Sequence, residues 1–73
     1  MEKLFHEMKK DTPINGSYYY LLRKYGRYAR IIGEGEWEEE NECFYNNDED
    51  KTYYTSEVDY YMEMPDQEQL DNL

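Results

Sequence analysis

The sequence predicts an α+β fold, in which one short N-terminal helix covers a small antiparallel sheet of three to five strands. Three observations lead to this class. Apolar side chains recur at helical spacing near the start, they alternate in several later segments, and turn residues separate those segments. Seventy-three residues suffice for one domain. We expect residues 1–65 to form it, and residues 66–73 to be a flexible tail.

The helix is predicted over residues 2–10, where Leu4, Phe5 and Met8 share one face. A segment this short is not helical alone, so its apolar face must pack on the rest of the chain. The helix has to end before Pro13, because the residue that precedes a proline avoids the α region. Asn15 and Gly16 then predict a turn.

The clearest strand prediction covers residues 17–23, in which tyrosines and leucines occupy both faces. A second strand is expected over residues 27–32. The short connection between them contains Gly26, which adopts a positive φ easily, so the two strands should form an antiparallel hairpin. Gly33 and Gly35 predict a bend or a bulge after the second strand.

Shorter strands are expected over residues 36–38, 43–45, 51–54 and 58–64, with the segments 43–45 and 51–54 pairing as a hairpin. Trp37 should point inward between two solvated glutamates. Polar residues 38–42 and 46–50 have the composition of loops. Pro65 ends the last strand, because proline lacks the donor that a sheet needs.

Charge divides the chain into two parts. Residues 1–33 carry a net charge of +4 and residues 34–73 a net charge of −14, so the chain carries −10. Ten tyrosines, two phenylalanines and one tryptophan supply enough ring surface for a folded core despite this charge. A surface field of one sign repels nucleic acid and anionic lipid and attracts basic partners. We therefore expect neither direct nucleic-acid binding nor membrane binding.

Basic and aromatic residues do alternate in the first hairpin, which is a pattern suited to stacking on single strands. The total charge opposes that encounter. We therefore expect these basic side chains to pair with the acidic half or to stack on tyrosines. They are Arg23, Lys24, Arg27 and Arg30, interleaved with Tyr25 and Tyr28.

No residue pattern predicts catalysis, a metal site or a cofactor. Cys43 is the one cysteine and His6 the one histidine, and Glu42 beside Cys43 disfavours the thiolate. We expect Cys43 to be a buried structural residue. The oxygen-rich loop 46–50 lacks the central glycine of an EF-hand and no second helix is expected after it, so it predicts at most weak divalent binding. The chain is expected not to be an enzyme.

The compartment is predicted to be the cytoplasm. The first 16 residues hold no apolar stretch of signal-peptide length, and no apolar run approaches the roughly 20 residues that span a bilayer. A lone thiol suits a reducing environment.

The order of several motifs resembles a group of small phage and prophage domains of unknown function. The matching pieces span about residues 13–65: Pro13 to Gly16, the strand at 18–23, Tyr25-Gly26, the strand at 27–32, Gly35 to Trp37, and Tyr61 to Pro65. The family closes on His-Trp-Met-Pro, whereas this chain has Tyr60-Tyr61-Met62-Glu63. The resemblance implies a small mobile-element protein in the host cytoplasm, and it implies no catalytic residue.

These observations favour a non-enzymatic acidic binding protein that imitates a row of phosphates and blocks a basic host protein, such as a defence nuclease or a CRISPR effector. Trp37 is the predicted rim anchor. The alternative is a structural or accessory domain that forms homo-oligomers through an exposed apolar face containing Tyr19, Leu21, Ala29 and Ile31. A ligand-binding oligomer is a third class. The expected partner-binding residues are Glu34, Glu36, Trp37, Glu38, Glu39, Glu40, Asp48, Glu49 and Asp50.

Overall fold

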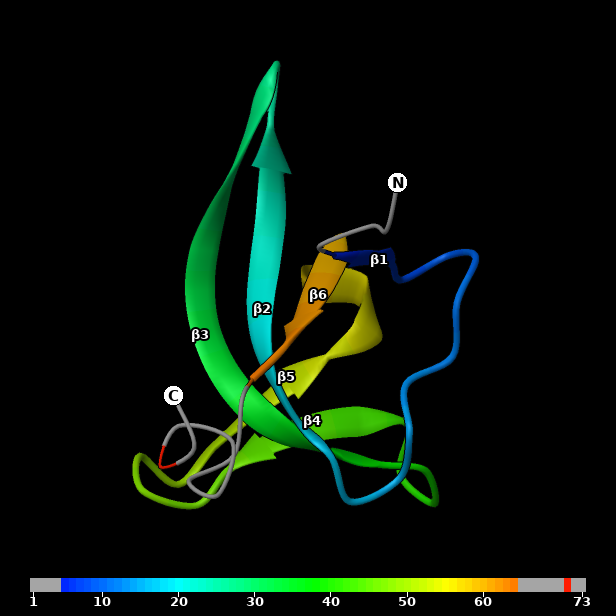
Figure 1. Ribbon diagram of the computed structural model, residues 1–73, viewed down its shortest axis with the longest axis vertical. Helices are drawn as coiled ribbons and strands as arrows, with labels where there is room; N and C mark the ends of the chain where they lie inside the picture. Colours follow the sequence, from blue (N-terminus) through cyan, green and yellow to red (C-terminus); the bar gives the residue numbers. More distant parts are fainter. Residues whose placement is uncertain (1–4, 65–70, 72–73) are drawn as a thin grey trace.

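Six antiparallel strands form one sheet in the computed structural model, which describes residues 5–64 and Asp71 (Figure 1). The order across the sheet is β1-β6-β2-β3-β4-β5. A 3₁₀ turn, η1, precedes the last strand. The elements are β1 (His6–Glu7), β2 (Tyr18–Tyr25), β3 (Tyr28–Glu38), β4 (Cys43–Asn46), β5 (Lys51–Tyr54), η1 (Thr55–Glu57) and β6 (Tyr60–Glu63).

The predicted α+β class is therefore wrong, because residues 5–64 are all-β and the sheet has six strands rather than three to five. In place of the expected helix, His6 pairs with Tyr61 and Glu7 with Tyr60. The His6 ring stacks on Tyr61 at 5.0 Å, and Phe5 meets Tyr60 edge-on at 5.2 Å. A nine-residue helix is marginal alone, so pairing with β6 and these ring contacts determine the local structure.

The predicted hairpin is confirmed as β2 and β3, which are longer than expected. The turn between them is formed by Gly26 and Arg27, and Gly26 has a φ of +62°. A glycine with positive φ at the first central position is the pattern of a type II′ turn, whose twist suits a hairpin. The bulge predicted near Gly33 is also present. Leu21 pairs with Gly33 and Leu22 with Ile31, so the register shifts there and Ile32 is left without a partner on β2.

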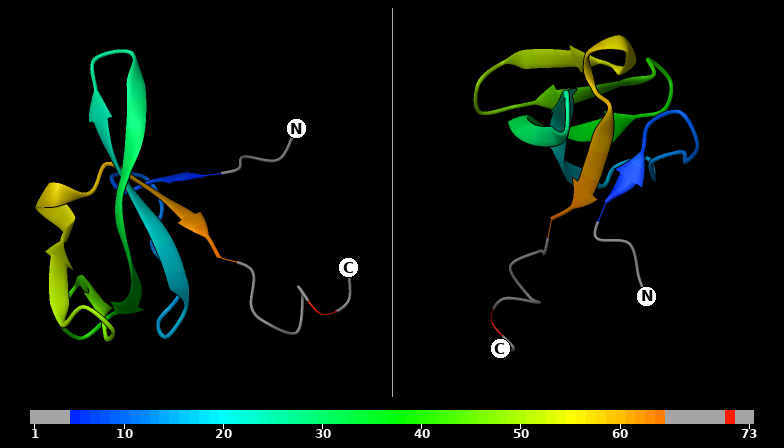
Figure 2. Two further views of the ribbon diagram at one scale, coloured as in Figure 1. Left: turned by 90° about the vertical axis from the view of Figure 1, so that its left-hand side faces the viewer. Right: turned by 90° about the horizontal axis from the view of Figure 1, so that it is seen from above.

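Strand β3 continues through both glycines and absorbs the separate strand expected at residues 36–38. A Cβ atom at Gly33 would overlap the hydroxyl and Cζ of Tyr53 on β5, so the absent side chain lets that ring lie against β3. Gly35 is buried, and a Cβ there would lie 3.1 Å from that of Phe44. The glycines thus let the sheet curl until β5 faces β3, as Figure 2 shows.

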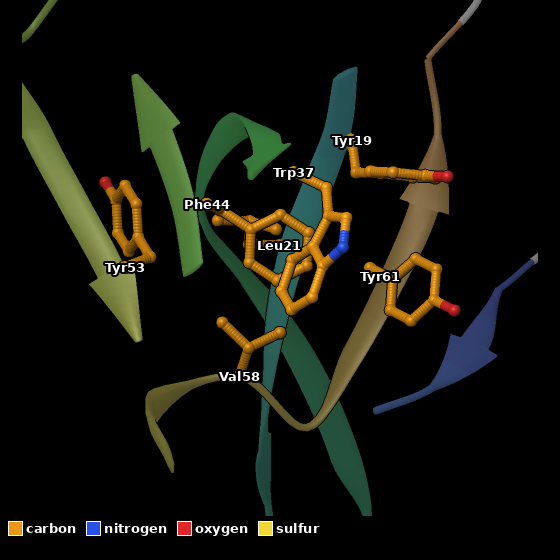
Figure 3. Close-up of a cluster of buried hydrophobic side chains, with 7 residues drawn as sticks. All are labelled: Tyr19, Leu21, Trp37, Phe44, Tyr53, Val58 and Tyr61. Carbon is orange, nitrogen blue, oxygen red and sulfur yellow. The ribbon is translucent and has the colours of Figure 1, made fainter. Parts of the chain in front are cut away.

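The curled sheet encloses a cluster of aromatic and aliphatic side chains (Figure 3). Trp37 and Phe44 have ring centroids 4.8 Å apart, and Tyr19 meets Tyr61 edge-on at 4.9 Å. Burying a side chain such as Phe44 contributes about 1.5–3 kcal/mol. The cluster consists of Tyr19, Leu21, Trp37, Phe44, Tyr53, Val58 and Tyr61.

The remaining strand predictions are confirmed with small shifts. β4 pairs with β5 as expected, and the last strand is β6, shorter at its start because η1 and Val58 precede it. β6 pairs with β2, which places the end of the described chain beside its first long strand. The tail expected over residues 66–73 lies outside the described residues, apart from Asp71.

Candidate functional site

Glutamates line the outer face of β3, opposite the core. Glu34, Glu36 and Glu38 alternate with Gly35 and Trp37, which are buried on the inner face. The strand register continues this face onto the neighbouring strands, because Glu36 pairs with Tyr18 on one side and with Tyr45 on the other. We call the resulting surface the acidic face. It comprises Tyr18, Glu34, Glu36, Glu38, Tyr45, Asp48, Glu49 and Asp50.

The pKa of the Tyr18 hydroxyl is affected by several of these acids. Burial raises its pKa above the usual value for tyrosine, and four carboxylates raise it further: those of Glu34, Asp48, Glu49 and Glu36. Negative charges act in this direction because they disfavour the ionised phenolate. Residues from β3 and from the β4–β5 loop therefore converge on one point of β2, although about 14 residues separate them in the chain.

Tyr45 ties the β4–β5 loop to the face. Its hydroxyl donates a 2.5 Å hydrogen bond to Oδ1 of Asp50. This bond is the largest cause of a raised Tyr45 pKa, followed by burial and by the charges of Asp50 and Glu38. Charge-assisted bonds of this kind are stronger than neutral ones. The contact orients Asp50 towards the same surface as Glu38.

Asn46 gives the loop a second anchor. Its side chain is 2% exposed, and its Oδ1 accepts a 3.0 Å hydrogen bond from the backbone N–H of Glu49. Asp50 closes the turn with a φ of +50°, a conformation that Asp tolerates better than most residues. The loop that carries Asp48, Glu49 and Asp50 is thus held from its buried side while its carboxylates stay exposed.

Glu39 and Glu40 extend the negative surface onto the β3–β4 turn. Both are exposed, and together with Asn15, Glu38 and Asn41 they line a shallow hollow. The backbone N–H of Glu39 donates a 3.0 Å hydrogen bond to Oδ1 of Asn15. All eight predicted carboxylates therefore lie between the middle of β3, at Glu34, and the end of the β4–β5 loop, at Asp50.

Trp37 does not belong to this surface. Its side chain is 4% exposed and lies in the core cluster, as the inward orientation predicted from the sequence requires. Its role as a rim anchor is therefore corrected, because a buried indole cannot contact a partner at the edge of an interface. Tyr18 and Tyr45 are the aromatic residues that lie on the acidic face. Sequence reasoning missed them, because only the strand register reveals that they flank Glu36.

Cys43 is buried, as expected, and its thiol lies 3.7 Å from a Glu38 carboxylate oxygen. Burial raises the pKa of the Cys43 thiol, and the charge of Glu38 and its hydrogen bond raise it further. His6 lies on β1, at the other end of the strand order from β4, where its ring nitrogens are 3.5 Å from Asp11 and 3.7 Å from Glu63. The arrangement keeps the thiol protonated and provides it with no imidazole base.

Among residues 5–64 and Asp71, no three His, Cys, Asp or Glu side chains are grouped as a metal site requires. The same part of the chain holds no helix with the length and apolar character needed to cross a bilayer. Comparison with protein families, curated proteins and solved structures finds no match to this chain.

Proposed function

We propose that this protein is a non-enzymatic binding protein whose acidic face docks on a basic protein surface that otherwise holds a nucleic-acid backbone. The observation that carries the proposal is the row of Glu34, Glu36 and Glu38 on one face of β3. Strand pairing sets this row beside Tyr18 and Tyr45, and the Tyr45 hydroxyl bonds to Asp50 of the β4–β5 loop. Spaced charges on a rigid support are what a phosphate-binding groove recognises.

The spacing of the acids can be compared with that of phosphates. Alternate residues on a strand lie about 6.8 Å apart, so Glu34, Glu36 and Glu38 span about 14 Å. One DNA strand carries about four phosphates over the same axial length. With the three β4–β5 loop acids, Asp48 to Asp50, the acidic face presents a comparable charge. Tyr18 and Tyr45 add ring surface beside Glu36, and tyrosine is a preferred interface anchor.

The proposed target is a nucleic-acid-handling protein of the host, such as a defence nuclease or CRISPR effector, and the proposed source is a phage or other mobile element. The sequence resemblance over about residues 13–65 supports this source. Charge complementarity supports the class of target, because a nucleic-acid groove presents lysine and arginine side chains to a row of phosphates.

The oligomeric alternative loses part of its basis. It requires Tyr19 and Leu21 to be exposed, but they are 2% and 0% exposed in the core. Only Ala29 and Ile31 of the expected apolar face lie on the surface. The curled sheet, rather than a helix, covers the face.

The test is a pull-down from host lysate at about 0.05 M salt, repeated at 0.5 M, where the screening length falls to about 4 Å. We expect a basic nucleic-acid enzyme at low salt, and its loss at high salt or on addition of DNA. A combined Glu34→Gln and Glu36→Gln variant should bind about 10-fold more weakly. The control is Glu63→Gln, which removes a charge from the other face. Equal binding by all three proteins would refute the proposal.

A further inference from the structure

The β2–β3 hairpin extends beyond the core as a two-stranded ribbon (Figures 1 and 2). Every residue from 23 to 31 is exposed. Two rings are among these residues, because Tyr25 is 46% exposed and Tyr28 is 62% exposed. We call this end of the hairpin the basic tip. It comprises Arg23, Lys24, Tyr25, Arg27, Tyr28 and Arg30.

Strand pairing places like groups opposite each other on the basic tip. Arg23 pairs with Arg30, and Tyr25 pairs with Tyr28. These four side chains share one side of the ribbon, because pairs two positions apart point the same way. Like charges directly opposite each other destabilise a sheet. The arrangement has a local cost that binding of an anionic partner would remove.

Within the described part of the chain, no carboxylate forms an ion pair with a side chain of the basic tip. The three ion pairs there involve only His6 and Lys10 as cations. Asp59 is the nearest acid in the hydrogen-bond network, and its carboxylate accepts a 2.7 Å bond from the backbone N–H of Lys24. Arg30 does lie over the Tyr28 ring at 5.9 Å. The expected stacking is therefore present, whereas the expected pairing with the acidic half is absent from residues 5–64.

The basic tip lies at one end of the β2–β3 hairpin, and the acidic face begins at Glu34, four residues beyond Arg30 on β3 and about 13 Å along the strand. The remaining acids lie farther away, in a molecule whose longest dimension is 36 Å. Exposed charges are screened beyond about 8 Å at physiological salt. The two surfaces therefore screen each other only weakly within one molecule, and direct contact between them requires a second molecule.

We propose that the basic tip of one molecule docks on the acidic face of a second copy, head to tail. Charge complementarity between these two surfaces of the same chain identifies the occupant. Arginine and tyrosine on the tip are the residue types that anchor protein interfaces, and Tyr18 and Tyr45 provide rings for them to pack against. Nucleic acid fits less well, because it presents negative charge on every side to a chain of net charge −10.

The contact joins two different patches, so copies that stack end to end form a heterologous, open row, whereas two antiparallel copies exchange both contacts about a two-fold axis. In the head-to-tail row each added copy offers a free tip and a free face, so the mean mass keeps rising with concentration. A mean mass that levels off at twice that of the monomer indicates the antiparallel pair instead. Either assembly shrinks as salt rises. The inference does not depend on the proposed function, although a basic partner on the acidic face would compete with the tip for it.

The experiment is sedimentation velocity and light scattering of the full chain from about 10 µM to 1 mM, at 0.05 M and 0.5 M salt. We expect the mean mass to rise above the 9.0 kDa monomer with concentration at low salt and to return to it at high salt. One variant cancels the net charge of the tip with Arg23→Glu and Arg30→Glu. The other removes most of the negative charge of the face with Glu34→Lys and Glu36→Lys.

Each variant alone should stay monomeric, because the altered tip has no net charge and the altered face keeps only a third of its negative charge. A mixture of the two should associate again, since each supplies the surface that the other lacks. Tyr28→Ala changes no charge and should weaken association about 10-fold. A wild-type protein that stays at 9.0 kDa throughout, or a mixture that stays monomeric while both variants remain folded, overturns the inference. A monomer that binds a single-stranded oligonucleotide through the tip overturns it as well.

Discussion

The curl of the sheet depends on the missing side chain of Gly33, and Gly33→Ala tests this directly. The added Cβ would lie 3.0 Å from Cε1 of Tyr53 and closer still to the end of that ring. Ordinary separations are about 3.5–4.0 Å, so the ring has to move by about 1 Å. Tyr53 is 3% exposed, so its ring can move only against neighbouring atoms of the core. Overpacking of this kind costs about 1–3 kcal/mol, offset by about 0.5–1 kcal/mol because alanine suits a strand better than glycine.

The net expectation for Gly33→Ala is a loss of about 1–2 kcal/mol, which lowers the melting temperature of a domain this size by roughly 5–15 °C. Thermal unfolding followed by circular dichroism measures it. In a Tyr53→Leu background the shorter side chain leaves room, so the same substitution should become neutral or stabilising. A melting temperature within about 2 °C of wild type, with the same effect in both backgrounds, would refute the packing argument.

Three further predictions concern single buried groups. Burial raises the pKa of Tyr61 to about 12, whereas the pKa of a tyrosine in the unfolded chain is about 10. Between these values the unfolded state loses a proton that the folded state keeps, so the free energy of unfolding falls from pH 10 to pH 12. Tyr61→Phe should flatten that decline in urea titrations. Cys43 should react with a thiol reagent only after unfolding. Glu38→Gln should change this reactivity little, because burial is the largest cause of the raised Cys43 pKa. Rapid labelling of the folded protein would contradict this prediction. Asn46→Ala leaves the Glu49 N–H without its acceptor and should cost about 1–2 kcal/mol, measured by urea unfolding.

The strand pattern was predictable where alternation and turn chemistry agree. Residues 18–23 and Gly26 led to the β2–β3 hairpin, and the polar loop 46–50 led to the β4–β5 hairpin. The helix prediction for the N-terminal segment was wrong for a physical reason. Leu4, Phe5 and Met8 have helical spacing, but a two-residue strand at His6–Glu7 has no periodicity that could reveal it. Its structure is set by β6, which lies about 54 residues later in the chain.

The acidic residues of the candidate site were predictable from composition, and their common surface was not. Glu34 and Glu49 are distant in sequence, and only the register of Glu36 with Tyr18 and Tyr45 brings their segments together. Trp37 illustrates the opposite case. Its alternation with the glutamates correctly predicted an inward side chain, and that observation already argued against a role at the rim.

The burial of Trp37 has a spectroscopic consequence. It is the single tryptophan of the chain, its indole packs 4.8 Å from Phe44, and its Nε1 has no hydrogen-bond acceptor among the described residues. Such an apolar environment shifts indole emission to shorter wavelength, and unfolding shifts it back. Neither the acidic face nor the basic tip includes this ring. The Trp37 emission wavelength therefore reports folding and should not change when a partner docks. An emission change on mixing with a partner would therefore indicate that the core itself rearranges.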